Sequence, residues 1–350
     1  MKKSLNLNVE ELQRAYLDVV GLNTMSIQEL QDLRSKFDGC FPDLHEYYFW
    51  DREEGFKQYY KRFAKWFIAR KENNLLELEG GLNHPKNMAV ETSIYALDSG
   101  PLTLHYGAFI PAVELMASDE QLKYWKPLYD NLRISGAYVQ TELGHGSDVS
   151  QLKTTATFDT KTQEFIVHTP DVNAIKFWPG GLGKTANTIV LYARLISKGE
   201  DHGVQAFICR IRDAENHLPL PGIQVGDVGT KLGFRTSDQG FLRFTNFRIP
   251  KSALLCKYMS ISEDGTFTKS SANAKKLMYG GMLNLRTLMV LLSHKYIGKL
   301  AVIAARYAFK RRQFQSNDGP GYPETLIIHY QMQQFKILPA FSYAWTILYV

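Results

Sequence analysis

The sequence has few cysteines and no long apolar run. Its three cysteines, Cys40, Cys209 and Cys256, are far apart and odd in number, which predicts neither a disulfide framework nor a metal site and favours a reducing compartment. No apolar stretch reaches the ~20 residues that a membrane-spanning helix needs. Met1-Lys-Lys is followed by a polar stretch, so we expect no secretory leader.

A strong charge imbalance is also missing. The 41 basic and 35 acidic residues give a formal net charge of +6, spread along the chain. Nucleic-acid-binding domains cluster Lys and Arg on one face, often beside aromatic residues, and no such stripe occurs here. The sequence therefore predicts no nucleic-acid partner and at most a mild attraction to anionic ligands.

Two nucleotide-binding patterns are absent as well. Gly183-Lys184-Thr185 ends like a phosphate-binding P-loop, but Trp178 stands where that motif needs its first glycine. The segment leads into a β-branched run over 187–195, which predicts a strand, whereas a P-loop opens a helix. The predicted strands follow one another without intervening helices, which argues against a Rossmann fold.

What is present predicts helices, then strands, then helices. Ser118 and Gln121 form a capping box. Strand-like alternation with glycine and proline turns extends from about residue 135 to 250 and is typical of an antiparallel barrel or sandwich. Aromatic residues in the first helical region recur at spacings of three and four, which predicts a buried helix face; they are Phe56, Tyr59, Tyr60, Phe63, Trp66 and Phe67.

One glycine-containing stretch, from Tyr138 to Asp148, is a candidate ligand loop. Its glycines permit positive φ and close approach of the backbone to a ligand. Inward-pointing amides, with the hydroxyls of Thr141 and Ser147, offer donors without fixed charge, which suits a flat heteroaromatic ring with carbonyls on its edge. An ordinary turn between two strands is the alternative interpretation.

Six blocks occur in an order that resembles a known family. They are the loop 138–148, Leu152-Lys-Thr-Thr-Ala-Thr157, Trp178-Pro-Gly-Gly-Leu-Gly-Lys184, Pro219-Leu-Pro-Gly-Ile223, Gly226-Asp-Val-Gly229 and Phe247-Arg-Ile-Pro250. From about residue 100 onward the chain resembles the acyl-CoA oxidases, the peroxisomal flavoenzyme branch of the acyl-CoA dehydrogenase superfamily. The resemblance implies an α+β, acyl-CoA dehydrogenase-like fold. It would have an N-terminal helical domain (1–134), a central antiparallel β-barrel that binds flavin (135–272) and an incomplete C-terminal helical bundle (273–350).

The resemblance also implies binding residues. Those matching the loop at the isoalloxazine edge of FAD are Gln140, Thr141, Gly146 and Ser147, and those matching the second flavin loop are Gly180 and Gly181. Ser147 also counts toward the substrate site, as do Tyr279 and Arg286, which match positions lining the acyl-CoA pocket. Residues matching the group that reaches the FAD pyrophosphate of a neighbouring subunit are Arg311, Gln331 and Gln334.

Some of these residues have simpler explanations. Arg311 stands between two basic residues and would also suit a solvated helix face. Arg286 lies on an apolar helix, where we expect it to be buried and to need a partner. His105 matches a helix close to the flavin domain, but a buried core histidine is the simpler expectation.

The implied reaction is α,β-desaturation of acyl-CoA to trans-2-enoyl-CoA, with FAD passing electrons to O2 to give H2O2. Desaturation needs a base for the α-proton, an oxyanion site and a hydride acceptor. In the family the base is a glutamate that would lie beyond residue 350. Superfamily members with the base on the first bundle helix would place it at Leu285, which cannot accept a proton. Glu142 matches a structural glutamate and Glu324 lies in a surface-type loop, so we expect no catalytic residue in this chain.

The resemblance thus predicts a C-terminally truncated acyl-CoA oxidase of peroxisomal fatty-acid β-oxidation, inactive alone. The sequence ends in an apolar segment with Leu-Tyr-Val, without the Ser-Lys-Leu type of peroxisomal signal, so localisation rests on the family. The implied partners are acyl-CoA, O2 and a second subunit, in a homodimer or in a heterodimer with a related oxidase. A non-catalytic paralogue that pairs with a full-length oxidase is the alternative, and an acyl-CoA dehydrogenase is a third.

Overall fold

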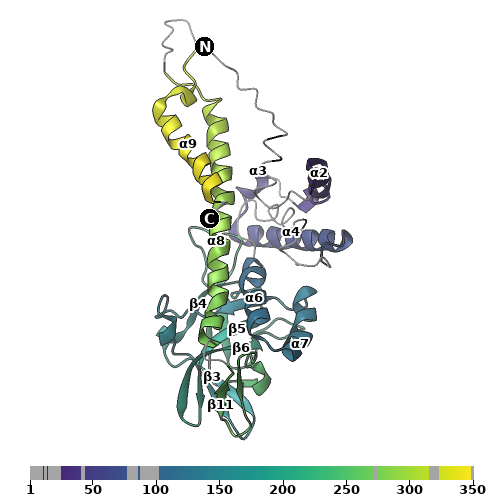
Figure 1. The fold of residues 1–350 in the computed structure, drawn as a ribbon, viewed down its shortest axis with the longest axis vertical. Helices are drawn as coiled ribbons and strands as arrows, with labels where there is room; N and C mark the ends of the chain where they lie inside the picture. The colour runs from purple at the N-terminus through teal and green to yellow at the C-terminus, as the bar shows by residue number, and fades with distance from the viewer. Residues whose placement is uncertain are drawn as a thin grey trace. The chain divides into compact units, whose positions relative to one another are not determined.

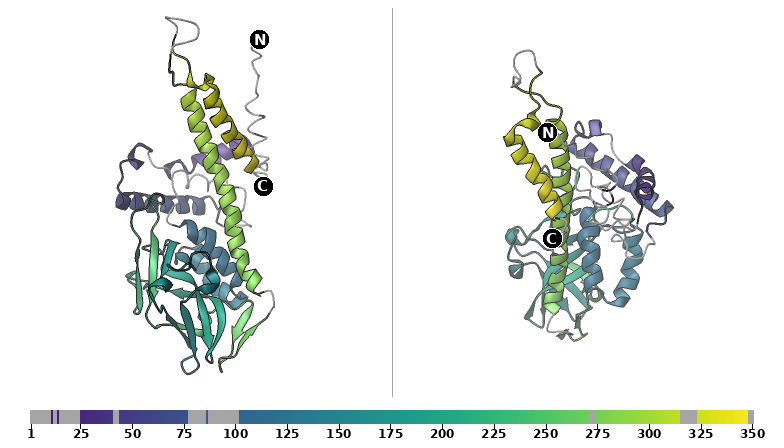
Figure 2. Two further views of the ribbon diagram at one scale, coloured as in Figure 1. Left: turned by 90° about the vertical axis from the view of Figure 1, so that its left-hand side faces the viewer. Right: turned by 45° about the horizontal axis from the view of Figure 1, so that its top comes forward.

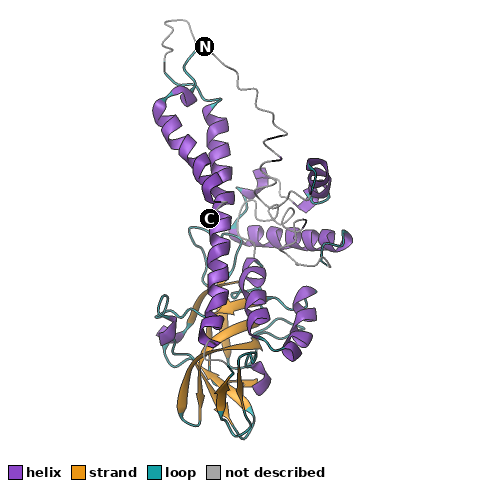
Figure 3. Cartoon of the chain, viewed as in Figure 1, coloured by secondary structure: helices purple, strands orange, loops and turns teal. Residues whose placement is uncertain are grey.

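A computed structural model describes residues 11, 14, 25–40, 44–76, 86, 102–270, 274–314 and 323–347. The chain divides into a core unit (Gln28–Gly281) and a helical unit (Met1–Ile27 with Met282–Val350), which we describe separately. Helices come first along the chain, strands occupy its middle and helices return at the end (Figure 3). This order confirms the predicted α+β class.

The strands of the core unit form three sheets in the described residues. The largest has six strands in the order β1 (Gly136–Val139), β5 (Thr188–Ser197), β2 (Thr155–Asp159), β3 (Glu164–His168), β9 (Phe247–Pro250), with β6 (Glu200–Arg210) paired to β5. A three-stranded sheet has the order β4 (Lys176–Gly180), β8 (Gln239–Phe244), β7 (Ile223–Asp227), and β10 (Met259–Ile261) pairs with β11 (Phe267–Lys269).

The predicted antiparallel arrangement is wrong at two pairings. Strands β1 and β2 both run parallel to β5, whereas β5 and β6 form a long antiparallel pair. Parallel neighbours need a crossover of about a dozen residues or more. The long connections from β1 and β2 to β5 supply these crossovers, and period-two patterning does not report strand direction.

Strand β5 is central because both of its faces are buried. Ile189 and Leu191 point into a cluster shared by the two larger sheets, whose strands curl around it (Figures 1 and 2). Val190 and Tyr192 point the other way, into a second cluster with the helices α6 (Ile110–Met116) and α7 (Asp119–Asp130). An unbroken apolar run is the expected pattern for a strand covered on both sides.

The remaining helices of the core unit begin the chain. They are α2 (Ile27–Ser35), which starts one residue before this unit, η1 (Asp38–Cys40), α3 (Leu44–Tyr47), α4 (Arg52–Glu72) and the π-helical turn η3 (His105–Phe109). Short 3-10 turns η4 (Val149–Gln151), η5 (Val172–Ala174) and η6 (Lys251–Ala253) join strands. The cap of α4 is Asp51, whose side chain accepts a hydrogen bond from the Glu54 amide at 2.7 Å.

The histidine of η3 is a core residue, as predicted. His105 is 1% exposed, and its Nδ1 accepts a hydrogen bond from the Gly136 amide at 2.9 Å. The ring stacks on Phe109 with centroids 5.5 Å apart. Burial lowers the pKa of His105 to about 4, so the ring is neutral at pH 7.

The helical unit contains most of α8 (Ala274–Ala308), together with η7 (Ile327–His329) and α9 (Gln331–Thr346). Within it, His294 Nδ1 on α8 lies 2.5 Å from the Ala344 carbonyl oxygen on α9. Its small buried cluster consists of Ala308, Ile327, Ile328 and Ile337. No described helix is both long and apolar enough to cross a lipid bilayer.

Candidate functional site

The two predicted ligand loops meet in the core unit. The first loop follows β1, and the second begins at the end of β4. The Phe177 amide donates to the Thr141 carbonyl at 3.0 Å, and the Leu143 amide donates to the Ile175 carbonyl at 2.8 Å. Stretches about forty positions apart in sequence therefore form one continuous surface.

The first loop has backbone donors that are free to bind a ligand. Gly146 and Ser147 are exposed, and no described residue accepts a hydrogen bond from either amide. A Cβ added at Gly146 would meet nothing within 4 Å, so there is open space beside the backbone. Gln140 and Thr141, on the same loop, are half-buried. The loop thus offers uncharged donors next to open space. Neither Gly144 nor Gly146 adopts the positive φ that the glycines of this loop suggested.

The second loop is built on a strained bulge. Strand β4 shifts register against β8 between Phe177 and Gly180, and within this bulge Trp178 has φ 84°. A bulky residue at positive φ is rare and persists only where its surroundings hold it. The Trp178 side chain is 54% exposed. Such bulges re-aim side chains and occur often beside active sites.

The two predicted glycines of the second loop are buried. A Cβ at Gly180 would lie 2.9 Å from Leu104 Cδ1, so the strand end packs closely on the segment before η3. Gly181 has φ 78°, a conformation that favours glycine. Their side-chain-free backbone is required by packing and turn geometry, whatever else they do.

Beneath the first loop lies a buried ion pair. Glu142 is 1% exposed and Lys176 is fully buried, with Oε1 and Nζ 3.1 Å apart. Oε1 also accepts from Thr154 Oγ1 at 2.6 Å, and Oε2 lies 3.0 Å from His145 Nδ1. Two backbone amides complete the set: Lys153 donates to Oε2 at 2.8 Å and Thr154 donates to Oε1 at 2.9 Å. The carboxylate therefore fixes the loop and has no free lone pair directed at a substrate.

The pKa values of this pair fit a structural role. Burial alone would raise the pKa of Glu142, but Lys176 and the hydrogen bonds from Thr154 and two amides outweigh it, so the pKa is lowered. Burial lowers the pKa of Lys176. The interpretation of Glu142 as a structural glutamate is supported, and its use as a general base is not.

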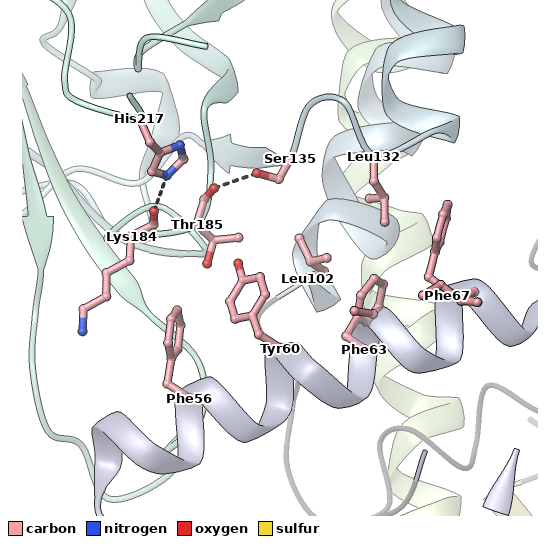
Figure 4. Close-up of a pocket in the computed structure, with 12 residues that line it drawn as sticks. Phe56, Tyr60, Phe63, Phe67, Leu102, Leu132, Ser135, Lys184, Thr185 and His217 are labelled. Atoms are coloured by element: carbon pink, nitrogen blue, oxygen red, sulfur yellow. Dashed lines mark hydrogen bonds between the residues drawn. The ribbon is translucent and has the colours of Figure 1, made fainter. Parts of the chain in front are cut away.

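A pocket of about 580 Å³ lies between α4 and the residues that follow the second loop. Figure 4 shows aromatic side chains projecting from α4 toward Leu102 and Leu132 on its opposite wall. At its polar end Ser135 Oγ donates to the Thr185 carbonyl at 2.7 Å. The pocket is lined mainly by apolar side chains.

The pocket changes the interpretation of the aromatic stripe on α4. Tyr59 and Trp66 are buried, as a core-facing stripe predicts. Phe56, Tyr60 and Phe67 are only half-buried and line the pocket. The prediction is therefore confirmed for one half of the stripe and wrong for the other, because helical spacing reports a shared face and not what covers it.

The other predicted residues lie on α8, α9 and the segment between them. Arg311 follows α8 and is exposed; its carbonyl accepts a hydrogen bond from the Ile327 amide at 2.9 Å. Gln331 opens α9, and Gln334 on the same helix donates to the Ile328 carbonyl at 3.0 Å. The structure thus brings Arg311 and both glutamines into the helical unit.

Both predicted substrate residues of the helical bundle lie on α8. Arg286 on α8 is exposed, so the expected burial is wrong. Tyr279 lies on α8, but its side chain is outside the described residues, as is that of Leu285. Among the residues that the structure describes, no group of three or more His, Cys, Asp or Glu comes together to bind a metal, and all three cysteines are free.

Sequence comparisons identify the family. The family model described as "Acyl-coenzyme A oxidase N-terminal" matches residues 28–135, and the model described as "Acyl-CoA oxidase, C-alpha1 domain" matches residues 279–350. Peroxisomal acyl-coenzyme A oxidase 1 of Arabidopsis thaliana is 40% identical over 303 residues, which are 85% of this chain and 44% of that protein. The chain belongs to the acyl-CoA oxidase family. The human peroxisomal acyl-coenzyme A oxidase 1 is 43% identical over 250 residues, covering 71% of this chain and 37% of that protein.

Solved acyl-CoA oxidases share the fold. Arabidopsis thaliana acyl-CoA oxidase 1 matches with a TM-score of 0.85 and 34% identity, over 97% of this chain and 50% of that one. Acyl-CoA oxidase-2 of Caenorhabditis elegans, solved with FAD, ascaroside-CoA and ATP, matches with a TM-score of 0.85 and 31% identity, over 100% of this chain and 53% of that one. The chain thus spans about half, or less, of the length of these relatives.

Sequence reasoning missed several residues that shape the site. It treated Trp178 only as the residue that breaks a P-loop. A bulky residue directly before Pro-Gly-Gly is itself a signal of a strained turn. It did not connect Lys176 with Glu142, nor Arg212 and Asp238 with the second loop. A buried charge in a strand of apolar neighbours, such as Lys176 in Ile-Lys-Phe, predicts an ionic partner but does not identify it.

Proposed function

We propose that this chain forms the flavin-binding part of an acyl-CoA oxidase and that its cofactor is FAD. The observation that carries the proposal is the junction of two loops, the first of which has free amides, in a chain of this family. Two acyl-CoA oxidases of Caenorhabditis elegans were solved with FAD. The exposed amides of Gly146 and Ser147, beside open space, suit the polar edge of an isoalloxazine ring.

Residues of this chain would hold and shield the cofactor. Gln140, Thr141, Gly146 and Ser147 would bind the ring edge, and Gly180 and Gly181 would shape the second loop. The exposed indole of Trp178 would provide an apolar surface that shields a bound ring from water. Bound FAD would supply the hydride acceptor and, through a ribityl hydroxyl, part of the oxyanion site.

The α-proton needs a base, and the carboxylates that the sequence offered as candidates do not suit this role. Glu142 is committed to Lys176 and Thr154, and Leu285 has no basic group. Glu324 is exposed, in the segment before η7. We therefore propose that the base lies outside these 350 residues and that the chain alone holds FAD without desaturating substrate.

The remaining functional assignments follow the family. We propose acyl-CoA as substrate and O2 as electron acceptor, with trans-2-enoyl-CoA and H2O2 as products. We further propose that Arg311, Gln331 and Gln334 reach a neighbouring subunit's FAD in a dimer, and that Tyr279 and Arg286 contact substrate. The relatives are named peroxisomal oxidases, which supports a role in peroxisomal fatty-acid β-oxidation.

Peroxide release tests this assignment. The purified chain, loaded with FAD, is mixed with acyl-CoA of several chain lengths under air, and a full-length acyl-CoA oxidase serves as the positive control. We expect bound flavin that acyl-CoA does not bleach anaerobically, and no peroxide. Sustained peroxide release by the chain alone would show that it contains a base.

A second function is favoured by the helical unit. Large apolar side chains on α9 lie outside its small buried cluster and are exposed, among them Met332, Phe335 and Leu338. Such surfaces usually mark contacts with another chain. A non-catalytic subunit that pairs with a full-length oxidase would use them. Light scattering of the chain alone and mixed with that oxidase tests the second function, which requires a stable mixed complex and is refuted if the two chains do not associate.

A further inference from the structure

The turn that follows the second loop is held by a buried arginine. Arg212 is 4% exposed and lies just beyond β6. Its guanidinium donates to the carbonyl oxygens of Leu182 at 3.2 Å, Gly183 at 2.8 Å and Ala186. Three carbonyls of one turn therefore converge on a single buried cation.

The amides of the same turn are held by a buried carboxylate. Asp238 is fully buried and precedes β8. Its Oδ2 accepts from the amides of Lys184 at 2.6 Å and Thr185 at 2.8 Å, and its Oδ1 accepts from Thr185 Oγ1 at 2.8 Å. Donors and acceptors of the turn are thus satisfied by opposite charges.

This arrangement ties the charges to the position of the turn. A buried charge that loses its hydrogen-bond partners pays a large desolvation cost. Arg212 and Asp238 are solvated by peptide groups of the turn, so any movement of Leu182–Ala186 would leave both uncompensated. The turn is also tightly packed, because a Cβ at Gly183 would lie 2.9 Å from Asp227 Cα.

The turn Leu182–Ala186 also supports the strained bulge that precedes it. Trp178 and Gly181 have φ values of 84° and 78°, and such backbone must be held on both sides. On its N-terminal side the Phe177 amide is bonded to Thr141. On its C-terminal side Gly180 pairs with Gln239 of β8, and the Gly181 carbonyl accepts a hydrogen bond from the Ala186 amide at 2.7 Å. The peptides bound by Arg212 and Asp238 follow directly, and they include Ala186, whose amide holds Gly181.

We infer that Arg212 and Asp238 are positioning residues for the second flavin loop, fixing Leu182–Ala186 so that Trp178–Gly181 keep the geometry that receives FAD. The inference rests on the proposed function of these loops. Neither residue lies on the exposed loop surface, so each acts through the backbone that it holds. The pair is a requirement for cofactor affinity beyond the residues that face the ring.

FAD affinity of variants of the full chain tests the inference. Asp238→Ala removes three hydrogen bonds to a charged acceptor, and we expect the FAD dissociation constant to rise about tenfold or more. Asp238→Asn keeps a carbonyl acceptor for the two amides and should stay within about threefold of wild type. Arg248→Ala, which removes an exposed arginine paired with Glu164, is the matched control and should bind as wild type does.

Thr185→Val is a milder substitution that keeps the test decisive if Asp238→Ala fails to fold. It removes the hydroxyl bond to Asp238 and keeps both amide bonds, and we expect a two- to fivefold weaker FAD complex, on the order of one hydrogen bond, in a chain that still unfolds cooperatively. Wild-type affinity in both Thr185→Val and Asp238→Ala would overturn the inference while leaving the proposed function intact. An equal loss of FAD affinity in Arg248→Ala and Asp238→Ala would overturn it too, because the effect would not be specific to the turn. Failure of the wild-type chain to bind FAD would instead refute the proposed function.

Discussion

At the scale of single residues, the buried pair of Glu142 and Lys176 determines whether the first loop keeps its shape. Glu142→Gln leaves Lys176 as a buried charge without a counter-ion, and we expect unfolding free energy to fall by about 3–5 kcal/mol. Asp130→Asn is the control, since Asp130 pairs with Lys126 on the surface and should cost less than about 1 kcal/mol. Urea unfolding measures both, and equal losses would contradict the account.

The same pair predicts a pH dependence. The pKa of Glu142 is lowered from its ordinary 4.5, chiefly by Lys176 and hydrogen bonds that overcome burial. Its contribution is therefore complete above pH 4.5 and is lost as the pH falls through the lower folded value. The part of the stability difference between wild type and Glu142→Gln that comes from the Glu142 carboxylate should shrink as the pH falls below 4.5. A difference that grows as the pH falls below 4.5 would contradict this sign.

Substitution of Gly146 distinguishes an effect on folding from an effect on cofactor binding. A Cβ there meets nothing within 4 Å, so Gly146→Ala should change unfolding free energy by less than about 0.5 kcal/mol. If the backbone receives a ring at this point, the added methyl group should weaken FAD binding about tenfold or more. Gly39→Ala, where a Cβ also meets nothing within 4 Å, is the control. An unchanged FAD affinity in Gly146→Ala would show that the ring does not bind at this loop.

At the scale of elements, α7 is attached to the sheet through its capping box. Gln121 caps the helix by accepting from the Ser118 amide at 3.0 Å, and its Nε2 donates to the carbonyls of Ser252 and Leu254 at 2.9 and 2.8 Å. Ser118→Ala should cost about 1 kcal/mol. Gln121→Ala loses the cap and the connection, so we expect about 2 kcal/mol or more. Equal costs in urea unfolding would show that the connection adds nothing.

The elements also show what the sequence could predict. Alternation and capping located the helices and strands, and the unbroken apolar run of β5 reflects its two buried faces. Strand direction at β1 and β2 was missed because period-two patterns are the same in parallel and antiparallel sheets. The buried ionic contacts were missed because they join residues far apart, as Thr185 and Asp238 are, at a separation of 53 positions. Exposure of Arg286 was mispredicted because the apolar residues around it suggested a helix covered on all sides.

At the scale of the whole molecule, the predicted site divides between the two units. The core unit joins the two loops that we propose to bind FAD and anchors each with buried charges. The helical unit carries Arg311, Gln331 and Gln334, which we propose to reach a neighbouring subunit's cofactor. Membership of the acyl-CoA oxidase family supports both proposals.

The central claim is that the joined loops hold FAD. The most direct test is the visible absorption spectrum of the purified chain after incubation with FAD and removal of free cofactor by gel filtration. We predict that a flavin spectrum elutes with the wild-type chain and is lost or much reduced in Gly146→Ala. A folded wild-type chain that elutes colourless would contradict the claim.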